Sequence, residues 1–204
     1  MTEHARRHSP AAERNRAPIL AELQRLLPAS GLLLEVASGT GQHAAFCSAG
    51  LPGWQWQPTE FDAASLPSIA AWCTGAARVR PPLLLDVLQA PWAGVPETVD
   101  AIFCANLIHI APWVCCAGLM QGAARHLSAT GLLITYGPYL EDEVPTSPGN
   151  LAFDADLRSR SAAWGLRRRE DVAWVAANAG LVLQERVAMP ANNLLLVWAR
   201  RPAA

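Results

Sequence analysis

The chain has 204 residues, of which 51% are hydrophobic and 16% charged, and its formal net charge is -1. This length and composition suit one folded domain and exclude a largely disordered chain. The near-neutral charge gives no general attraction to nucleic acid, so a small-molecule partner is favoured over DNA or RNA.

Cysteine usage and the N-terminal sequence both indicate a cytoplasmic protein. The five cysteines are odd in number, and none forms a CxxC pair or stands beside a His at zinc spacing. We therefore expect no disulfide framework and no metal site. Residues 1–18 are polar and Arg-rich, unlike a secretory signal, and no apolar run is long enough to span a bilayer. A monomer or a homodimer is expected.

Helices and strands are expected to alternate through the first half of the chain. Apolar residues recur on one face from Pro18 until Pro28, which predicts a helix between the two prolines. Short apolar runs bounded by turn residues predict strands, and longer periodic stretches predict helices. The expected elements are strand 32–36, helix 40–49, strand 54–59, helix 66–73 and strand 83–85.

The second half continues the alternation and then changes it. We expect strand 99–104, helix 114–127, strand 132–136, a long loop at 137–150, helix 170–179, and strands 181–188 and 194–199. The alternating part predicts a parallel sheet covered by helices on both faces. Only residues 189–193 join the last two strands, so these two must be antiparallel. The long loop is typical of a lid or a binding element.

The turn between the first expected strand and the next helix carries two glycines, Gly39 and Gly41. With Ala44 they match the pattern GxGxxA, which is weak and is shared with nicotinamide dinucleotide enzymes. Glu35 stands just before these glycines. A carboxylate there is unfavourable beside a pyrophosphate and suits a cationic nucleoside cofactor. An ordinary strand-to-helix turn is the alternative.

Further acids follow the next two strands. Glu60 lies about twenty residues after the glycines, where an acid accepts hydrogen bonds from a ribose diol, and Asp62 competes for this role. Asp86 follows the third strand and is placed to meet an adenine amino group. A single acid of this kind is usually a solvated strand end, but three in succession favour a nucleoside site. Its expected contacts are completed by Ala37, His43, Val87 and Asn106.

The acceptor side of the site is expected after the fourth and fifth strands. His109 is a candidate general base, since an unperturbed His titrates near neutrality, or else it only packs beside the cofactor. Tyr136 is a second catalytic candidate or a core residue. Candidate substrate contacts, each with an ordinary turn, core or solvated-surface alternative, are Arg16, Trp113, Tyr139, Asn150, Arg158, Trp164, Asn192 and Asn193. The arginines would bind an anionic group on the substrate.

Several long strings resemble one known family. They include residues 9–20 (SPAAERNRAPIL), 35–43 (EVASGTGQH), 106–110 (NLIHI), 136–139 (YGPY), 164–167 (WGLR) and 189–193 (MPANN). Over nearly its whole length the chain resembles the family of methyltransferase-like protein 26, which is part of the class I methyltransferases. Two departures are Glu60, where the family usually has Asp, and Arg168, where Asp is usual.

The resemblance implies a Rossmann-like class I methyltransferase fold of α/β class, with a seven-stranded, mostly parallel sheet and an antiparallel terminal strand. It also implies binding of S-adenosylmethionine, with S-adenosylhomocysteine as product and a small-molecule acceptor. We expect one domain over 1–204, with 1–18 as an N-terminal arm and 137–168 as a lid or substrate-side insertion. The alternatives are an NAD(P)-dependent oxidoreductase and a cofactor-binding protein without turnover.

Overall fold

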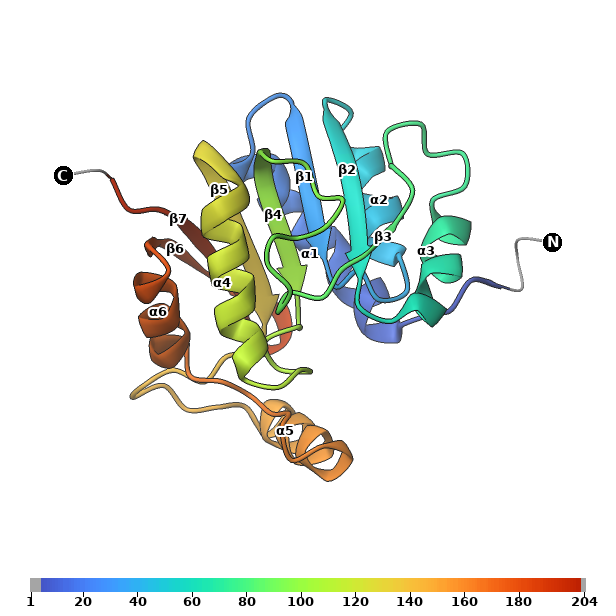
Figure 1. Ribbon diagram of the computed structural model, residues 1–204. Coiled ribbons are helices and arrows are strands. Elements are labelled where there is room, and N and C mark those ends of the chain that lie inside the picture. Colours follow the sequence, from blue (N-terminus) through green and yellow to red (C-terminus); the bar gives the residue numbers. More distant parts are fainter. Residues whose placement is uncertain (1–4, 203–204) are drawn as a thin grey trace.

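A seven-stranded sheet with helices on both faces forms the molecule, as Figure 1 shows for the computed structural model, which describes residues 5–202. The strands lie in the order β3-β2-β1-β4-β5-β7-β6. Their bounds are β1 Gly31–Val36, β2 Trp54–Glu60, β3 Leu83–Leu84, β4 Val99–Ala105, β5 Leu127–Gly137, β6 Leu181–Met189 and β7 Asn193–Arg200.

The first five strands are parallel, and β7 runs antiparallel to both of its neighbours, β5 and β6. This arrangement confirms the expected mostly parallel sheet with an antiparallel terminal strand. The chain moves outward from β1 to β3 on one side and from β4 onward on the other. The order therefore reverses between β1 and β4, where open α/β sheets commonly bind ligands.

Two apolar clusters join the helices to the sheet. Helices α1 (Pro10–Leu26) and α2 (Gln42–Gly50) cover one face, where Ile19, Leu23 and Cys47 pack on Trp56 and Phe103. Helices α4 (Val114–His126) and α6 (Arg169–Asn178) cover the other. Strands buried on both faces lack the alternation of half-exposed strands, which explains the continuous apolar runs in the sequence.

The first helix begins eight residues earlier than the sequence indicated, so the expected start at Pro18 is wrong. Ser9 caps the helix by accepting a hydrogen bond from the Ala12 N–H at 3.3 Å, and Pro10 occupies the first turn, where a missing N–H costs nothing. Pro18 lies inside the helix. The second half of the expected N-terminal arm, residues 10–18, is therefore helical.

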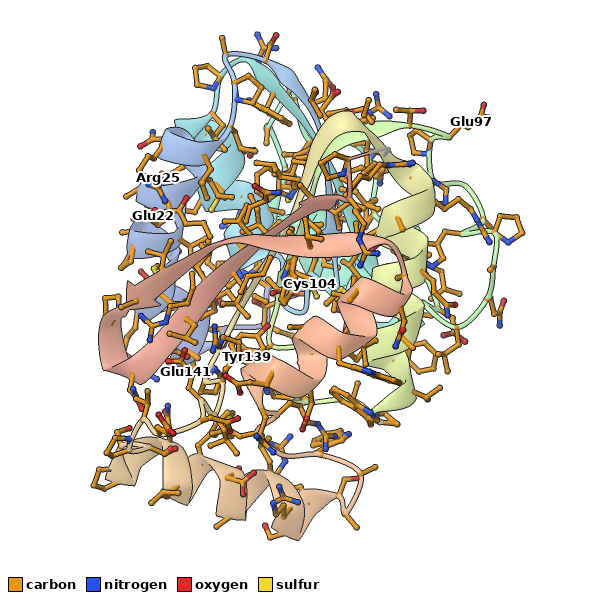
Figure 2. All side chains as sticks on the ribbon, turned by 90° about the vertical axis from the view of Figure 1, so that its left-hand side faces the viewer. Glu22, Arg25, Glu97, Cys104, Tyr139 and Glu141 are labelled. Carbon is orange, nitrogen blue, oxygen red and sulfur yellow. The ribbon has the colours of Figure 1, made fainter. Side chains whose placement is uncertain are left out.

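The segment after β5 contains a helix, α5 (Pro148–Arg160), which begins inside the expected loop. It lies beyond the carboxyl ends of the strands, apart from the sheet (Figure 1). The approach to it runs under the β6–β7 hairpin, where Glu141 accepts hydrogen bonds from Arg186 (Figure 2). The short helices η2 (Ala63–Ser65), α3 (Leu66–Trp72) and η3 (Pro190–Asn192) complete the fold.

Within residues 5–202, no helix combines the length and the apolar character needed to cross a membrane.

Candidate functional site

A cavity of about 610 Å³ lies at the carboxyl ends of the parallel strands, at the position where the strand order reverses. Its floor is the turn after β1, and its walls come from the ends of β2, β3 and β4, from the start of α1 and from Trp164. The parallel direction of the strands brings these loops together, because parallel strands end at the same edge of a sheet.

The turn that forms the floor is held in left-handed backbone conformations. The φ angles are 60° at Ala37, 59° at Gly39 and 92° at Gly41. A Cβ on Gly41 would lie 2.6 Å from the Ile69 Cα, whereas a Cβ on Gly39 would meet no atom within 4 Å. Gly41 therefore allows α2 to approach α3, while Gly39 leaves the floor of the cavity open to a ligand.

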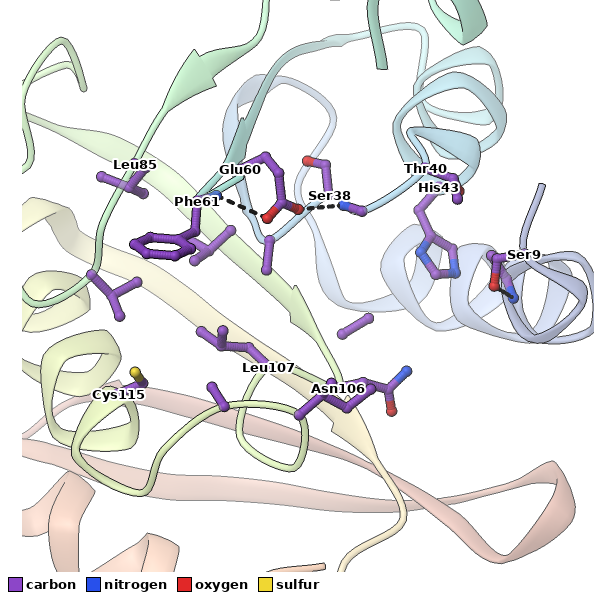
Figure 3. Close-up of a pocket in the computed structure, with 18 of the residues that line it drawn as sticks. Ser9, Ser38, Thr40, His43, Glu60, Phe61, Leu85, Asn106, Leu107 and Cys115 are labelled. Atoms are coloured by element: carbon purple, nitrogen blue, oxygen red, sulfur yellow. Dashed lines mark hydrogen bonds between the residues drawn. The ribbon is translucent and has the colours of Figure 1, made fainter. Parts of the chain in front are cut away.

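Glu60 connects this floor to the end of β2. Its Oε2 accepts a hydrogen bond from the Gly39 N–H at 2.7 Å, and its Oε1 accepts one from the Phe61 N–H at 2.8 Å (Figure 3). Oε1 also accepts a hydrogen bond from the Asp62 N–H at 3.4 Å. Oε2 keeps a lone pair, so it can also accept a hydrogen bond from a ligand diol.

The two sides of the cavity differ in character. Phe61, Leu85, Leu107 and Cys115 gather on one side of Glu60 in Figure 3. Asp86, the residue after Leu85, also lines the cavity. Asp86 Oδ1 accepts a hydrogen bond from the Leu88 N–H at 2.9 Å. This side is a largely apolar slot with one carboxylate, which suits a flat heterocycle that carries an amino group.

The opposite side is polar and uncharged. It contains Ser9, Thr40 and His43, which lie together in Figure 3, and also Asn15 from α1. His43 Nε2 lies 2.7 Å from Asn15 Oδ1. Burial, followed by the nearby Arg16 charge, lowers the pKa of His43 to about 4, so the ring is neutral at physiological pH.

Asn106 forms the wall at the end of β4. It has a φ of 64°, its N–H donates to the Tyr136 carbonyl at 2.8 Å, and its own carbonyl accepts from the His109 N–H at 3.0 Å. Ala37 and Asn106 are thus both non-glycine residues in left-handed conformations, one on each side of the point where the strand order reverses. Such strain is concentrated at ligand-binding sites in folded proteins.

The structure brings eight of the residues predicted from the sequence to this cavity. They are Ala37, Gly39, His43, Glu60, Asp86, Val87, Asn106 and Trp164.

Glu35 does not reach the cavity, contrary to the expectation that it contacts the cofactor. It is only 1% exposed, and its Oε2 accepts a hydrogen bond from Trp56 Nε1 at 2.9 Å. Burial raises the pKa of Glu35 to about 7. Gly41 and Asp62 are also outside the lining, and Asp62 instead caps η2 through the Ala64 N–H.

His109 is likewise not brought to the cavity, so the geometry does not support its expected role as a general base. The ring is 0% exposed and packs edge-on against Tyr139 at 4.7 Å between ring centroids. Within residues 5–202, neither ring nitrogen has a hydrogen-bond partner. Burial, followed by the Arg167 charge, lowers its pKa to about 3. A general base must reach its proton directly or through one water.

Both tyrosines of the expected site are buried beneath it. Tyr136 belongs to the apolar cluster beneath α1 and α2. Tyr139 donates a hydrogen bond to Thr135 Oγ1 at 2.9 Å. Neither side chain lines the cavity, so the structure gives both a packing role.

The other expected substrate contacts lie outside the cavity lining. Arg158 pairs with Asp154 at 2.7 Å, and Asn150 Nδ2 donates to the Asn192 carbonyl at 2.8 Å, which fastens α5 to the β6–β7 hairpin. Arg16 pairs with Glu13 and lies over Phe46. Trp113 and Asn193 also lie outside the lining. The Arg167 guanidinium lies over the Trp113 ring, and Asn193 Nδ2 donates a hydrogen bond to the Pro190 carbonyl.

Sequence reasoning missed most of the apolar lining. The missed residues are Ser9, Ala11, Ala12, Asn15, Val36, Ser38, Thr40, Phe61, Leu85, Leu88, Ala105, Leu107, Ile110, Ala111, Pro112 and Cys115. Apolar lining residues carry no sequence signal that separates them from core residues. The patterned stretch at residues 13–16 predicts a segment that folds over the cofactor or the substrate, with a solvated helix start as the alternative, and Asn15 of this stretch lines the cavity.

The described residues that line the cavity include two carboxylates, Glu60 and Asp86, and no Arg. The neutral His43 adds no charge. The two carboxylates therefore favour a ligand with positive charge and disfavour phosphate or pyrophosphate, which proteins often bind with Arg side chains.

Solved structures of methyltransferases share this fold. The mitomycin 7-O-methyltransferase MmcR matches with a TM-score of 0.80 and 15% identity over 93% of this chain and 54% of its own. CalO1, a methyltransferase of calicheamicin biosynthesis in its SAH-bound form, matches with a TM-score of 0.72 and 18% sequence identity. The match covers 92% of this chain and 54% of CalO1. Human N-acetylserotonin methyltransferase in complex with SAM matches with a TM-score of 0.78 and 13% sequence identity. The match covers 94% of this chain and 53% of that enzyme.

Fold and topology thus define the chain as a Rossmann-like α/β protein with the fold that these solved structures share. The chain spans about half the length of the solved structures that it matches. Over residues 6–200 it matches a family described as a protein of unknown function, DUF938, and it belongs to that family.

Proposed function

We propose that the protein is an S-adenosylmethionine-dependent methyltransferase that acts on an uncharged small-molecule acceptor. The observation that carries the proposal is the pair of carboxylates, Glu60 and Asp86, facing a cavity whose floor is the glycine turn and whose lining contains no Arg. S-adenosylmethionine carries a sulfonium cation and no phosphate, so its charge matches this lining.

In this proposal Glu60 accepts hydrogen bonds from the ribose hydroxyls, and Asp86 accepts one from the adenine amino group. The apolar slot formed by Leu85, Leu107 and Cys115 encloses the base. The cofactor supplies the activated methyl group, and the protein binds, orients and excludes water. Positioning of this kind can lower a reaction barrier by about 7–11 kcal/mol.

The acceptor would approach past Asn106 and Trp164. Because the arginines expected to bind an anionic substrate lie outside the cavity, we propose a neutral acceptor. A nicotinamide dinucleotide is disfavoured, since its pyrophosphate would face the two carboxylates.

Titration calorimetry with S-adenosylmethionine, S-adenosylhomocysteine and NAD in parallel tests this function. We expect binding of the first two and none of NAD. Binding of NAD alone would support an oxidoreductase and refute the proposal. A protein that binds S-adenosylmethionine but releases no S-adenosylhomocysteine with a broad panel of neutral acceptors would be a binding protein without turnover.

A further inference from the structure

The segment before α1 is fastened across α3. The backbone N–H of Arg7 donates to Ser68 Oγ at 2.9 Å, and its guanidinium donates to Ser65 Oγ at 3.1 Å. Trp72 Nε1 donates to the Arg7 carbonyl at 2.8 Å. These contacts hold the chain close to the cavity just before α1 begins.

The first turns of α1 are then bonded to the start of α2. The Ser9 N–H donates to Gln42 Oε1 at 2.6 Å, and Gln42 Nε2 donates to Glu13 Oε2 at 3.3 Å. Ala11, Ala12 and Asn15 line the cavity together, as expected for residues three and four apart on one helix face. The start of α1 thus forms a wall beside the glycine turn.

The Asn15 amide is oriented by His43. Its Oδ1 lies 2.7 Å from His43 Nε2. An amide oxygen only accepts, so Nε2 of His43 carries the proton and Nδ1 holds a lone pair. The pair therefore offers the cavity a hydrogen-bond acceptor on His43 together with the polar amide of Asn15.

The cavity leads from the apolar slot, past Glu60, to this pair. A nucleoside whose ribose bonds Glu60 and whose base enters the slot directs its 5′ substituent to the other side, where Ser9, Thr40 and His43 lie (Figure 3). In S-adenosylmethionine that substituent is an amino-acid tail with one ammonium and one carboxylate. A zwitterion is neutral overall, so uncharged donors and acceptors suit it.

We propose that Asn15 and His43 bind the amino-acid tail of the cofactor, so that the start of α1 is part of the cofactor site. This inference rests on the proposed function, because it needs S-adenosylmethionine in the cavity.

Two ligands that differ only beyond the nucleoside test the inference. S-adenosylhomocysteine carries the amino-acid tail, and 5′-methylthioadenosine replaces it by a methyl group. We expect Asn15→Ala to lower the affinity for S-adenosylhomocysteine by about tenfold or more and the affinity for 5′-methylthioadenosine by less than about twofold. Titration calorimetry on the full chain measures both affinities. His43→Gln should show the same selectivity.

Two controls make the result specific. Arg14→Ala changes an exposed neighbour on the same helix and should leave both affinities unchanged. Glu60→Ala should lower the affinity for both ligands. Circular dichroism confirms folding, and His43→Gln serves where Asn15→Ala does not fold.

Equal weakening of both ligands in a folded Asn15→Ala or His43→Gln protein would overturn the inference. An unchanged affinity for S-adenosylhomocysteine would overturn it too and would assign the pair to the acceptor. Failure of the wild-type protein to bind either ligand would instead refute the proposed function itself.

Discussion

At the scale of single residues, Glu60 is the side chain on which cofactor binding most depends. Replacement by Ala removes a charged acceptor from the proposed ribose contact, worth about 1.5–3 kcal/mol. We therefore expect Glu60→Ala to lower the affinity for S-adenosylhomocysteine, measured by calorimetry, by more than about tenfold.

Asp62→Ala is the matched control for this change. It removes the same charge two residues away, from a side chain that caps η2 and does not line the cavity. Equal affinities for the two variants would reject the ribose assignment.

Glu35 is expected to stabilise the fold and to matter little for the cofactor. Its pKa is raised to about 7 by burial, and Trp56 Nε1 donates to it. Glu35→Gln keeps an acceptor for Trp56, so S-adenosylhomocysteine affinity should stay within about threefold. Glu35→Ala leaves the buried indole N–H without its partner, which should lower the free energy of unfolding by about 1–3 kcal/mol.

Calorimetry and chemical denaturation of the two Glu35 variants separate these effects. A loss of affinity above tenfold in a stable Glu35→Gln protein would show that the carboxylate acts on the cofactor after all.

At the scale of elements, the glycine turn predicts unequal effects for two similar substitutions. Gly39→Ala places a methyl group in open space and should cost about 1–2 kcal/mol for the left-handed backbone. Gly41→Ala incurs the same strain and in addition directs its Cβ against the Ile69 backbone of α3. Overpacking of this kind adds about 1–3 kcal/mol.

Urea denaturation of the two glycine variants measures the difference. Equal losses would mean that α3 can move away from α2 at no cost.

The alternation of strands and helices was predictable because their apolar periodicities differ. The helix α5 was not predicted, since it has no continuous apolar stripe: Leu151 is 56% exposed, while Leu157 is buried. Its start was marked only by Ser147 and Pro148, a cap and a first-turn proline. The same Ser-Pro signal at residues 9–10 marks the true start of α1.

The candidate site was predictable where it depends on strand ends. Glu60 and Asp86 follow strands directly, so parallel pairing alone brings them to one edge. His109 lies further into the loop after β4, and its direction depends on tertiary contacts. Its ring approaches Gly137 so closely that a Cβ there would lie 2.4 Å from Nε2.

At the scale of the whole molecule, two buried histidines and one buried acid set the pH dependence of stability. Between about pH 6.5 and 5, the unfolded chain protonates His43 and His109, whereas the folded chain keeps both neutral because their pKa values are about 4 and 3. Folded Glu35, with a pKa of about 7, holds one proton that the unfolded chain releases.

The unfolded state therefore binds about one more proton, and the free energy of unfolding should fall by about 1.4 kcal/mol per unit as the pH is lowered. His109→Leu removes one of the two histidine contributions. In this variant the free energy of unfolding should therefore change little with pH over the same range. Denaturation at several pH values measures both slopes. An unchanged slope in the variant would mean that His109 takes up a proton in the folded protein.

The most direct test of the whole account is a crystal structure of the protein with S-adenosylhomocysteine. We predict the ribose hydroxyls within hydrogen-bond distance of Glu60, the adenine in the slot beside Asp86 and the amino-acid tail at Asn15 and His43. A structure in which the ligand lies elsewhere, or in which a pyrophosphate occupies the glycine turn, would contradict the account.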